Sequence, residues 1–510
     1  MVSHRTFRLS PAAILVCALL AGCAARGPDY QPQTPPSPAG WDSWRSGDAA
    51  LREGVSIDQA PLSAQWWTQF GDATLDSLQA RAREASPDLQ TAALRFAQSR
   101  VQRATVAAQR GPQVDATAAA QRQRQSEYSA STRLADAVTP GNRDQLVSVL
   151  SEPFTLYQAG FDASWEIDLW GRVRRSIESA DASVQTAAAL LEQVRLSVAS
   201  ELARAYFDWR LAQRQLSLLD SDIATATQTL SLLQARAQGG LITALDVSRQ
   251  RAQLADLQSR VAPLQARQAG IANQIGLLLG ARPGELAASL QAAPVPATDA
   301  LPATLPTLAL GVPADVARRR PDIVAAEHRL HAATADIGVA TADLYPRIVL
   351  GASFGAESFE AGRFGEWGTR AWRIGPSLSV PIFDQGRRRA TIELRELVRQ
   401  EAAVSYQQTV LKAWQEIDDA LNGYGAERQR NARLREKVAS SREALAWAQA
   451  RYAGGLTDFL VPLDAERVER QARRELVDSN HQLFVQLISI YKGVGGGAVV
   501  QGASPSGNAN

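Results

Sequence analysis

The chain has 510 residues, and its 54 Lys and Arg residues nearly balance its 52 Asp and Glu residues. This balance gives no reason to expect nucleic acid as a partner. With 45% hydrophobic and 21% charged residues the chain can bury a core, while two Cys and four His exclude a disulfide scaffold and leave little for catalytic or metal chemistry.

The first segment has the pattern of a secretory signal. Arg5 and Arg8 precede an apolar run at 12–20, which is too short to span a bilayer as a stable helix. The run leads into Leu-Ala-Gly-Cys, which resembles a bacterial lipobox. That resemblance implies removal of residues 1–22, a covalent lipid on Cys23 and sorting to the outer membrane. The alternative is a plain secretory signal in which the Cys is present by chance.

The remaining sequence contains an internal repeat. Ser-Pro-Asp-Leu at 86–89 is echoed by Arg-Pro-Asp-Ile at 320–323, and Gly-Gly-Leu at 239–241 is repeated at 454–456. Each copy has the pattern of a helix, a strand, a loop, a strand, a very long helix, a Gly-Gly turn and another long helix. The chain is therefore predicted to be a structural duplication.

The very long helix of the first copy is predicted from Arg172 to about Arg236. From Leu191 onward its apolar residues recur at a mean spacing of 3.5, the heptad pattern of a coiled coil. At 1.5 Å per residue such a helix is about 100 Å long, which no compact domain accommodates. Antiparallel partner helices are expected at about 244–279 and 459–492, after the Gly pairs.

Four segments alternate apolar and polar residues as strands do, at about 113–121, 157–169, 347–355 and 372–383. One apolar and one polar face fit a membrane barrel, and the alternative is half-buried strands of a soluble sandwich. No uncharged apolar run after Cys23 approaches 18 residues, so a membrane crossing must use strands in a closed barrel. Because four strands cannot close a barrel, it must be shared between chains.

The same patterns divide the chain into consecutive segments. These are the signal at 1–22, an extended N-terminal segment at 23–71, the first repeat at 72–281, a Pro-rich linker at 282–313, the second repeat at 314–493 and a disordered tail at 494–510. The stretches 121–153 and 355–371 are expected to be hairpin loops.

Together these features resemble the TolC-like outer membrane factors of efflux systems, in particular their lipoprotein branch, which is often called NodT-type. The resemblance covers nearly everything from Cys23 to about Gly497. Besides the lipobox and the duplicated Pro-Asp helix starts, it rests on the motifs at 27–30, 66–72, 167–172, 317–322 and 381–386.

The resemblance implies a mainly α-helical fold with a membrane β-barrel. A homotrimer would form a twelve-strand β-barrel in the outer membrane, continuous with an α-helical barrel through the periplasm. It further implies a periplasmic adaptor protein and an inner membrane pump of the RND class as partners. The trimer would be a passive duct for drugs or other small molecules, with no enzymatic activity and no cofactor apart from the lipid.

The resemblance also implies a gate where the coiled coils reverse. Leu460, Asp464 and Arg467 follow the second turn on one helix face and match the constriction residues of the family. Arg451 and Tyr452 match the positions that latch the inner helix pair to its neighbours. The alternative is an ordinary solvated helix end with an ion pair between residues three apart, which adds only a few tenths of a kcal/mol.

The two turns are expected to meet the adaptor. Bare Gly residues leave backbone groups exposed for a partner hairpin, and the Leu side chains add an apolar contact. The predicted contact residues are Gly239, Gly240, Leu241, Gly454, Gly455, Leu456 and Thr457. The alternative is turn chemistry with no partner.

Other functions are weaker alternatives. A channel of the same shape could serve protein or polysaccharide secretion, and a lipid-tethered coiled-coil scaffold would not conduct at all. His328 and His331 lie three residues apart on one predicted helix, and a pair without a third ligand is usually a surface coincidence rather than a metal site.

Overall fold

The computed structural model describes residues 25–41, 44–53, 55–60, 62–129, 141, 143–291 and 308–497. The predicted signal segment and the predicted lipid site at Cys23 lie outside the described residues. The chain divides into two compact units. The first contains Met1–Gln31, Ser99–Val184 and Leu330–Ala402, and the second contains Pro32–Gln98, Gln185–Arg329 and Ala403–Asn510.

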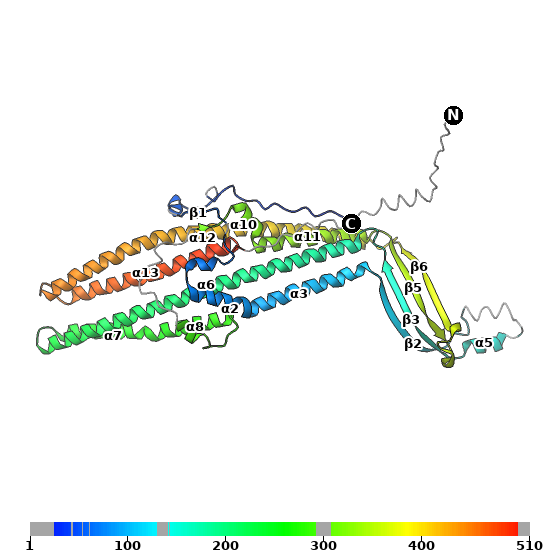
Figure 1. The fold of residues 1–510 in the computed structure, drawn as a ribbon, viewed down its shortest axis with the longest axis horizontal. Coiled ribbons are helices and arrows are strands. Elements are labelled where there is room, and N and C mark those ends of the chain that lie inside the picture. Colours follow the sequence, from blue (N-terminus) through cyan, green and yellow to red (C-terminus); the bar gives the residue numbers. More distant parts are fainter. Residues whose placement is uncertain are drawn as a thin grey trace, which may run out of the picture. The chain divides into compact units, whose positions relative to one another are not determined.

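The elements follow the predicted duplication, and Figure 1 labels most of them along the chain. The strands are β1 (Ile57–Asp58), β2 (Gln113–Gln123), β3 (Phe154–Glu166), β4 (Leu308–Ala309), β5 (Arg347–Ser358) and β6 (Arg370–Ser379). The α-helices are α2 (Ala73–Ala85), α3 (Pro87–Ala107), α5 (Arg143–Ser151), α6 (Arg172–Gln238), α7 (Ala244–Ser259), α8 (Val261–Leu278), α9 (Ala287–Gln291), α10 (Pro313–Arg319), α11 (Pro321–Ala342), α12 (Arg387–Ala453) and α13 (Leu460–Gly493).

The first unit contains one antiparallel sheet in the order β2-β3-β5-β6 (Figure 1). Its register places Ala116, Phe161, Phe354 and Trp372 in one row across all four strands. The three aromatic side chains of this row are 59%, 57% and 73% exposed. The predicted apolar face is therefore present and open in the single chain.

Two strands end earlier than their alternation predicts. In each case an acidic residue just beyond the strand end caps the helix that follows. The carboxylate of Asp168 accepts hydrogen bonds from the backbone N–H groups of Val173 and Arg174, at 3.1 and 2.8 Å. It thereby supplies acceptors that the first turn of α6 lacks, so β3 ends at Glu166 rather than at 169. Asp384 does the same before α12, and β6 ends at Ser379.

One predicted loop contains a helix that the sequence reasoning did not identify. Helix α5 lies within the stretch expected to be a hairpin loop at 121–153, and its Val147 is buried. With nine residues, α5 offers too short a periodic pattern to be separated from a polar loop. The corresponding loop of the second copy contains only two short 3₁₀ turns.

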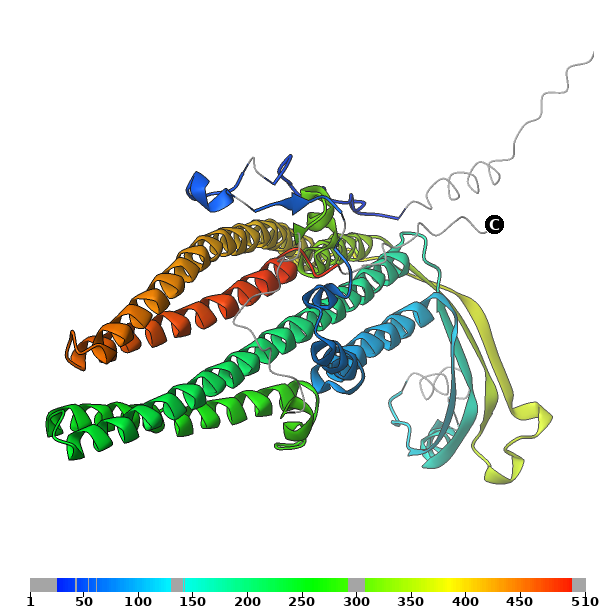
Figure 2. The ribbon, with the colours of Figure 1, turned by 60° about the vertical axis from the view of Figure 1, so that its left-hand side comes forward.

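In the second unit the long helices pack along the predicted heptad seam. Helices α6 and α12 have 67 residues each, so the duplication preserves their length. Leu202, Ala205, Trp209 and Ala212 of the predicted α6 seam are all buried. Figure 2 shows α12 and α13 (orange and red) side by side, and α6 beside α7 and α8 (green). In the described part of the chain, no helix is both long and apolar enough to span a membrane.

The partner helix predicted at 244–279 is broken into α7 and α8 at Arg260. Pro263 lies three residues beyond the break. A proline ring lacks the N–H donor and collides with the carbonyl four residues earlier, so a continuous helix cannot pass through it undisturbed. The second copy has its proline at Pro462, in the first turn of α13, where a helix tolerates it.

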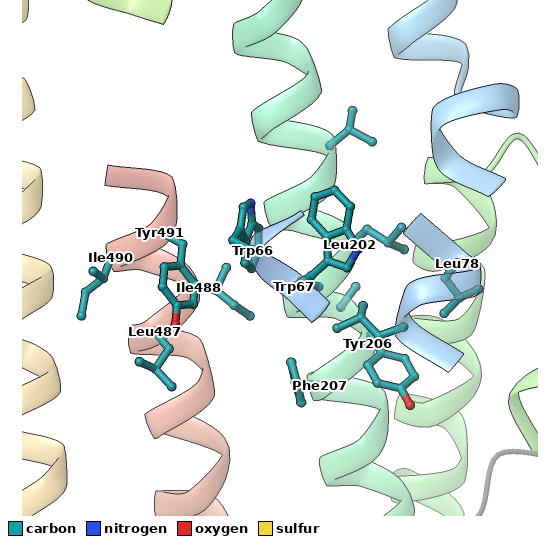
Figure 3. Close-up of a cluster of buried hydrophobic side chains, with 14 of the residues drawn as sticks. Trp66, Trp67, Leu78, Leu202, Tyr206, Phe207, Leu487, Ile488, Ile490 and Tyr491 are labelled. Atoms are coloured by element: carbon teal, nitrogen blue, oxygen red, sulfur yellow. The ribbon is translucent and has the colours of Figure 1, made fainter. Parts of the chain in front are cut away.

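An aromatic core joins the N-terminal segment to both copies (Figure 3). Trp66 and Tyr491 lie 5.4 Å apart between ring centroids and are almost fully buried. Phe207 of α6 stacks on Phe484 of α13 at 4.5 Å. Burying such rings removes large apolar areas from water, so this cluster stabilises the middle of the second unit.

Two segments predicted to be loose are packed where the structure describes them. In the predicted linker, β4 pairs in parallel with β1 through Ile57 and Leu308, and Leu310 is buried. Val494 is buried in the core and the Gly496 N–H donates to the Tyr491 carbonyl at 2.8 Å. The predicted tail therefore begins too early, because residues 494–497 belong to the folded unit.

Candidate functional site

The two helix reversals have the same backbone construction. Gly240 and Gly455 both have a φ of 72°, in the left-handed region that favours glycine. The Leu241 N–H donates to the Arg236 carbonyl at 3.0 Å, and the Leu456 N–H donates to the Arg451 carbonyl at 2.9 Å. This is the Schellman C-cap, so turn geometry explains the glycine at the second position of each pair.

Turn geometry does not explain the first glycine of each pair. Gly239 and Gly454 have helical hydrogen bonds to the carbonyls of Ala235 and Ala450, and neither has a positive φ. A Cβ atom at either residue would lie no closer than 3.6 and 3.5 Å to its neighbours, which is ordinary contact. Within the chain, alanine would fit both positions.

Each turn presents an exposed leucine. Leu241 is 76% exposed and Leu456 is 72% exposed, so each copy has an exposed apolar side chain at the same position of its turn. Thr457 follows in the second turn, and its hydroxyl oxygen is buried without a hydrogen bond among the described residues. The seven residues predicted to contact a partner thus form two similar, outward-facing turns.

The predicted gate residues lie on the first turns of α13. The Arg467 guanidinium donates to the Asp464 carboxylate at 2.8 Å, and both side chains are mostly exposed. Leu460, one turn earlier, is also exposed. The expected pairing of acid and base is present, but in the single chain it is a solvent-screened pair that adds about 0.2–0.5 kcal/mol.

Tyr452 connects the ends of the two long helices. Its ring lies 5.2 Å from the guanidinium carbon of Arg236 on α6 and 5.6 Å from the ring of Phe459. Its hydroxyl oxygen is buried without a hydrogen bond in the described structure. The neighbouring Arg451 is exposed, and its carbonyl accepts the turn hydrogen bond. Tyr452 therefore contacts the other copy within the same chain, in addition to any contact between chains.

Sequence reasoning missed a charged cluster between the helix pairs. Arg473 of α13 pairs with Asp222 of α6 at 2.7 Å and with Glu469 at 2.9 Å. Burial raises the pKa of the nearby Glu466 carboxyl. On α13 alone, charges spaced by four residues look like a solvated helix face. Only the packing of α6 against α13 reveals that these charges are buried.

A second missed network holds the N-terminal segment in the first unit. Arg175 of α6 pairs with Asp29 and, at 2.7 Å, with Glu178. The His331 ring lies 3.0 Å from the Glu178 carboxylate and stacks on Tyr30. The hydrogen bond with His331, more than the pairing with Arg175, lowers the pKa of Glu178.

His331 therefore belongs to this anchoring network. Among the residues that the structure describes, no group of three His, Cys, Asp or Glu is placed to hold a metal ion.

Comparisons with known proteins agree with this architecture. The family model for outer membrane efflux proteins matches residues 78–281 and 312–496. Outer membrane protein OprJ of Pseudomonas aeruginosa is 32% identical over 484 residues, covering 95% of each chain. The toluene efflux pump outer membrane protein TtgI of Pseudomonas putida is 30% identical over 480 residues, covering 94% of this chain and 96% of that one.

The fold has solved counterparts as well. The outer-membrane channel OprN matches with a TM-score of 0.79 and 34% identity, covering 93% of this chain and 99% of that chain. The resemblance, the fold class, the export function and the outer membrane location predicted from the sequence are thus confirmed. The chain belongs to the outer membrane efflux protein family.

Proposed function

We propose that this chain, as a homotrimer, forms the passive duct of a tripartite efflux system together with a periplasmic adaptor and an inner membrane RND pump. The duct itself needs no catalytic group and no cofactor. The observation that carries the proposal is the sheet of the first unit, whose exposed apolar face and unpaired edges call for further copies of the chain.

Strands β2 and β6 each have a single neighbour among the described residues. An open strand edge in lipid leaves N–H and C=O groups without partners, at several kcal/mol each. Three copies of a four-strand sheet would supply twelve strands, which lies within the range of membrane barrels. The exposed row through Phe161, Phe354 and Trp372 would then face lipid.

The periplasmic end of the duct would be closed by rings of Leu460, Asp464 and Arg467. A weak pair in one chain gains importance when three copies meet on a narrow axis, where charges act on passing solutes. Arg451 and Tyr452 would hold this end in its closed position, with the Tyr452 contact to Arg236 as the link inside each chain. Contact with the adaptor and the pump would open it.

The test is the single-channel conductance of the purified protein in planar bilayers. Asp464→Ala combined with Arg467→Ala should give a leaky duct with a several-fold higher conductance. The matched control is Arg433→Ala with Glu436→Ala, another exposed pair three residues apart, at 3.0 Å on α12. Unchanged conductance in the gate variant, or an equal increase in the control, would argue against this gate.

The helix turns would dock the adaptor. Gly239 and Gly454 support this role because nothing in the described parts of the chain requires glycine there. A partner helix that approaches the bare backbone would require it. Leu241, Leu456 and their neighbours would complete the contact.

The lipid on Cys23 would anchor the N-terminus in the outer membrane. The network of Asp29, Arg175, Glu178 and His331 begins six residues after Cys23. It would hold the segment that follows the lipid against α6 and α11.

A further inference from the structure

A cleft of about 490 Å³ lies between α7–α8 and α12–α13 in the second unit. Its wall contains five cationic side chains, Arg260, Lys437, Arg467, Arg470 and Arg474, and one anionic side chain, Asp256. This local excess of positive charge occurs in a chain that is nearly neutral overall. The cleft is separate from the turns and from the sheet.

We propose that this cleft binds a multivalent oxyanion of the phosphate or sulfate class. The inference does not depend on the trimer or the adaptor contact, because all of the lining residues belong to one chain. The cleft shares Arg467 with the proposed gate.

Three of the five cations have acidic partners at the rim. Arg260 pairs with Asp256 at 2.9 Å, Lys437 pairs with Glu475 at 2.7 Å, and Arg467 pairs with Asp464 at 2.8 Å. These are partly exposed pairs, which water and salt screen. They can rearrange toward a stronger anion at little cost.

Arg470 is the residue that points to a ligand. Its side chain is only 4% exposed, and its Nη1 lies 3.0 Å from the Glu466 carboxylate. Yet neither terminal nitrogen of this guanidinium has a hydrogen bond within the described structure. Glu466 therefore balances the charge of Arg470 without satisfying its terminal N–H donors. Buried donors without acceptors are costly, so an acceptor supplied from the cleft would stabilise this guanidinium.

The acids nearest to Arg470 compensate it poorly. Glu466 lies 3.0 Å from Arg470 but accepts no hydrogen bond from its terminal nitrogens, and burial raises the pKa of this carboxyl. Asp222 and Glu469 are engaged by Arg473 at 2.7 and 2.9 Å.

Arg474 adds a second, half-buried cation with a distant partner. Its Nη2 lies 3.7 Å from Asp222, beyond hydrogen-bonding distance. Burial, and after it the neighbouring Arg260 guanidinium, lower the pKa of Arg474. Like charges that crowd one cleft repel each other, and a bound anion would remove that repulsion.

The donor set selects the class of anion. Guanidinium groups present planar forks of N–H donors that match the oxygen atoms of phosphate and sulfate. A halide ion is a single acceptor atom, so it cannot form the bidentate pairs in which two oxygens accept from one guanidinium fork. The bound oxyanion would join Arg260 of the α7–α8 junction to Arg470 and Arg474 of α13, and so would hold the two helix pairs together.

The experiment measures the thermal midpoint of the full-length, detergent-solubilised protein. Sodium sulfate or inorganic phosphate is added at low millimolar concentration, with chloride used to keep the ionic strength constant. Selective binding to the folded state should raise Tm by a few degrees over chloride. Low concentrations keep the general salting-out effect of sulfate small.

Variants locate the effect. Arg470→Gln and Arg474→Gln should each abolish the oxyanion-dependent rise in Tm, whereas Arg435→Gln, an exposed α12 arginine outside the cleft, should keep it. If Arg470→Gln does not fold, the test uses Arg474→Gln and Arg470→Lys instead. The Arg470→Lys variant keeps the positive charge, so it should keep part of the oxyanion-dependent rise in Tm. An equal rise in chloride, or a rise that survives Arg474→Gln, would overturn the proposal.

A further arm replaces inorganic phosphate by glycerol phosphate. A rise with both compounds would assign the cleft to phosphate groups in general, including those of organic solutes and headgroups. A rise with the inorganic anions alone would assign it to free oxyanions. A rise with neither would refute the site.

Discussion

At the residue scale, two strands of the sheet approach closely at a glycine pair. Gly160 of β3 and Gly355 of β5 lie directly opposite each other. A Cβ atom on Gly355 would lie 2.5 Å from the Ala159 carbonyl oxygen, and one on Gly160 would lie 2.8 Å from the Phe354 carbonyl oxygen. Backbone atoms cannot move aside cheaply, so this pair sets the spacing of the two copies within the sheet.

Replacing Gly355 by alanine should therefore destabilise the sheet by about 1–3 kcal/mol, as overpacking does. The control is Gly351→Ala in the same strand, because a Cβ there lies 3.9 Å from its nearest neighbour. The readout is the temperature at which the folded protein converts to its unfolded mobility on a denaturing gel. Equal behaviour of the two variants would contradict the close approach.

The anchoring network makes a pH-dependent contribution at the same scale. Because His331, and after it Arg175, lower the pKa of Glu178 below its usual 4.5, folding favours the charged carboxylate. Its stabilisation is complete above about pH 4.5 and is lost as the pH falls through the lowered pKa. Glu178→Gln should reduce protection of the N-terminal segment from proteolysis at pH 7, with the difference from wild type disappearing in acid.

The control for this prediction is Glu443→Gln on the exposed surface of α12, which should change nothing at either pH. A Glu178→Gln deficit that stays constant down to strongly acidic pH would mean that the carboxylate charge is not the cause.

At the scale of elements, the sequence predicts the helices and strands whose apolar residues recur at a regular spacing. The heptad spacing predicts α6 and its buried seam, and the Gly-Gly pairs locate both turns. Ends are less predictable, because Asp168 and Asp384 act as helix caps inside segments that alternate like strands. The two-residue pair of β1 and β4 has no periodic signal at all, since its partners are far apart in the chain.

The candidate site divides in the same way. The turns are local features, and their Gly pairs predict them by number. The gate residues follow only from the family resemblance, and their role stays a prediction. The buried cations around Arg470 were not, because on one helix they resemble a solvated surface. Only the packing of α13 against other helices distinguishes a buried charge from an exposed one.

The turns themselves carry an element-scale prediction. Gly454→Leu should abolish cross-linking to the adaptor and drug export, while Gly454→Ala should have a smaller effect, because the folded chain accommodates a Cβ there. Gly270→Leu on α8 is the control, at an exposed helical glycine with open space around its Cβ position. Export and cross-linking that survive Gly454→Leu would show that the turn does not contact the adaptor.

At the scale of the whole molecule, the proposed trimer can be tested through the sheet edges. Both natural cysteines lie within the first 23 residues, so introduced pairs are simple to interpret. Strands β2 and β6 are separated by three strand spacings, about 14 Å, whereas a disulfide needs Cα atoms within about 7 Å. A disulfide between these edges therefore requires two chains.

One cysteine is introduced on β2 and one on β6, and the two positions are varied along the strands. After oxidation, some pairs should give covalent dimers and trimers, and the positions that do so along one strand should be two residues apart. Ala163→Cys with Ala352→Cys is the control, because these residues pair within one chain and should leave its mass unchanged. Edge pairs that yield only monomer at every register would contradict the shared sheet.

The equal length of α6 and α12 restricts how such a chain can change. Arg236 and Tyr452 meet near the ends of these two helices. Deleting one heptad from α6 alone would withdraw its end by about 10 Å and break that contact. The length of the two long helices should therefore vary among relatives only through matched, heptad-sized insertions or deletions in both copies. The two halves of the gene should then change in length together.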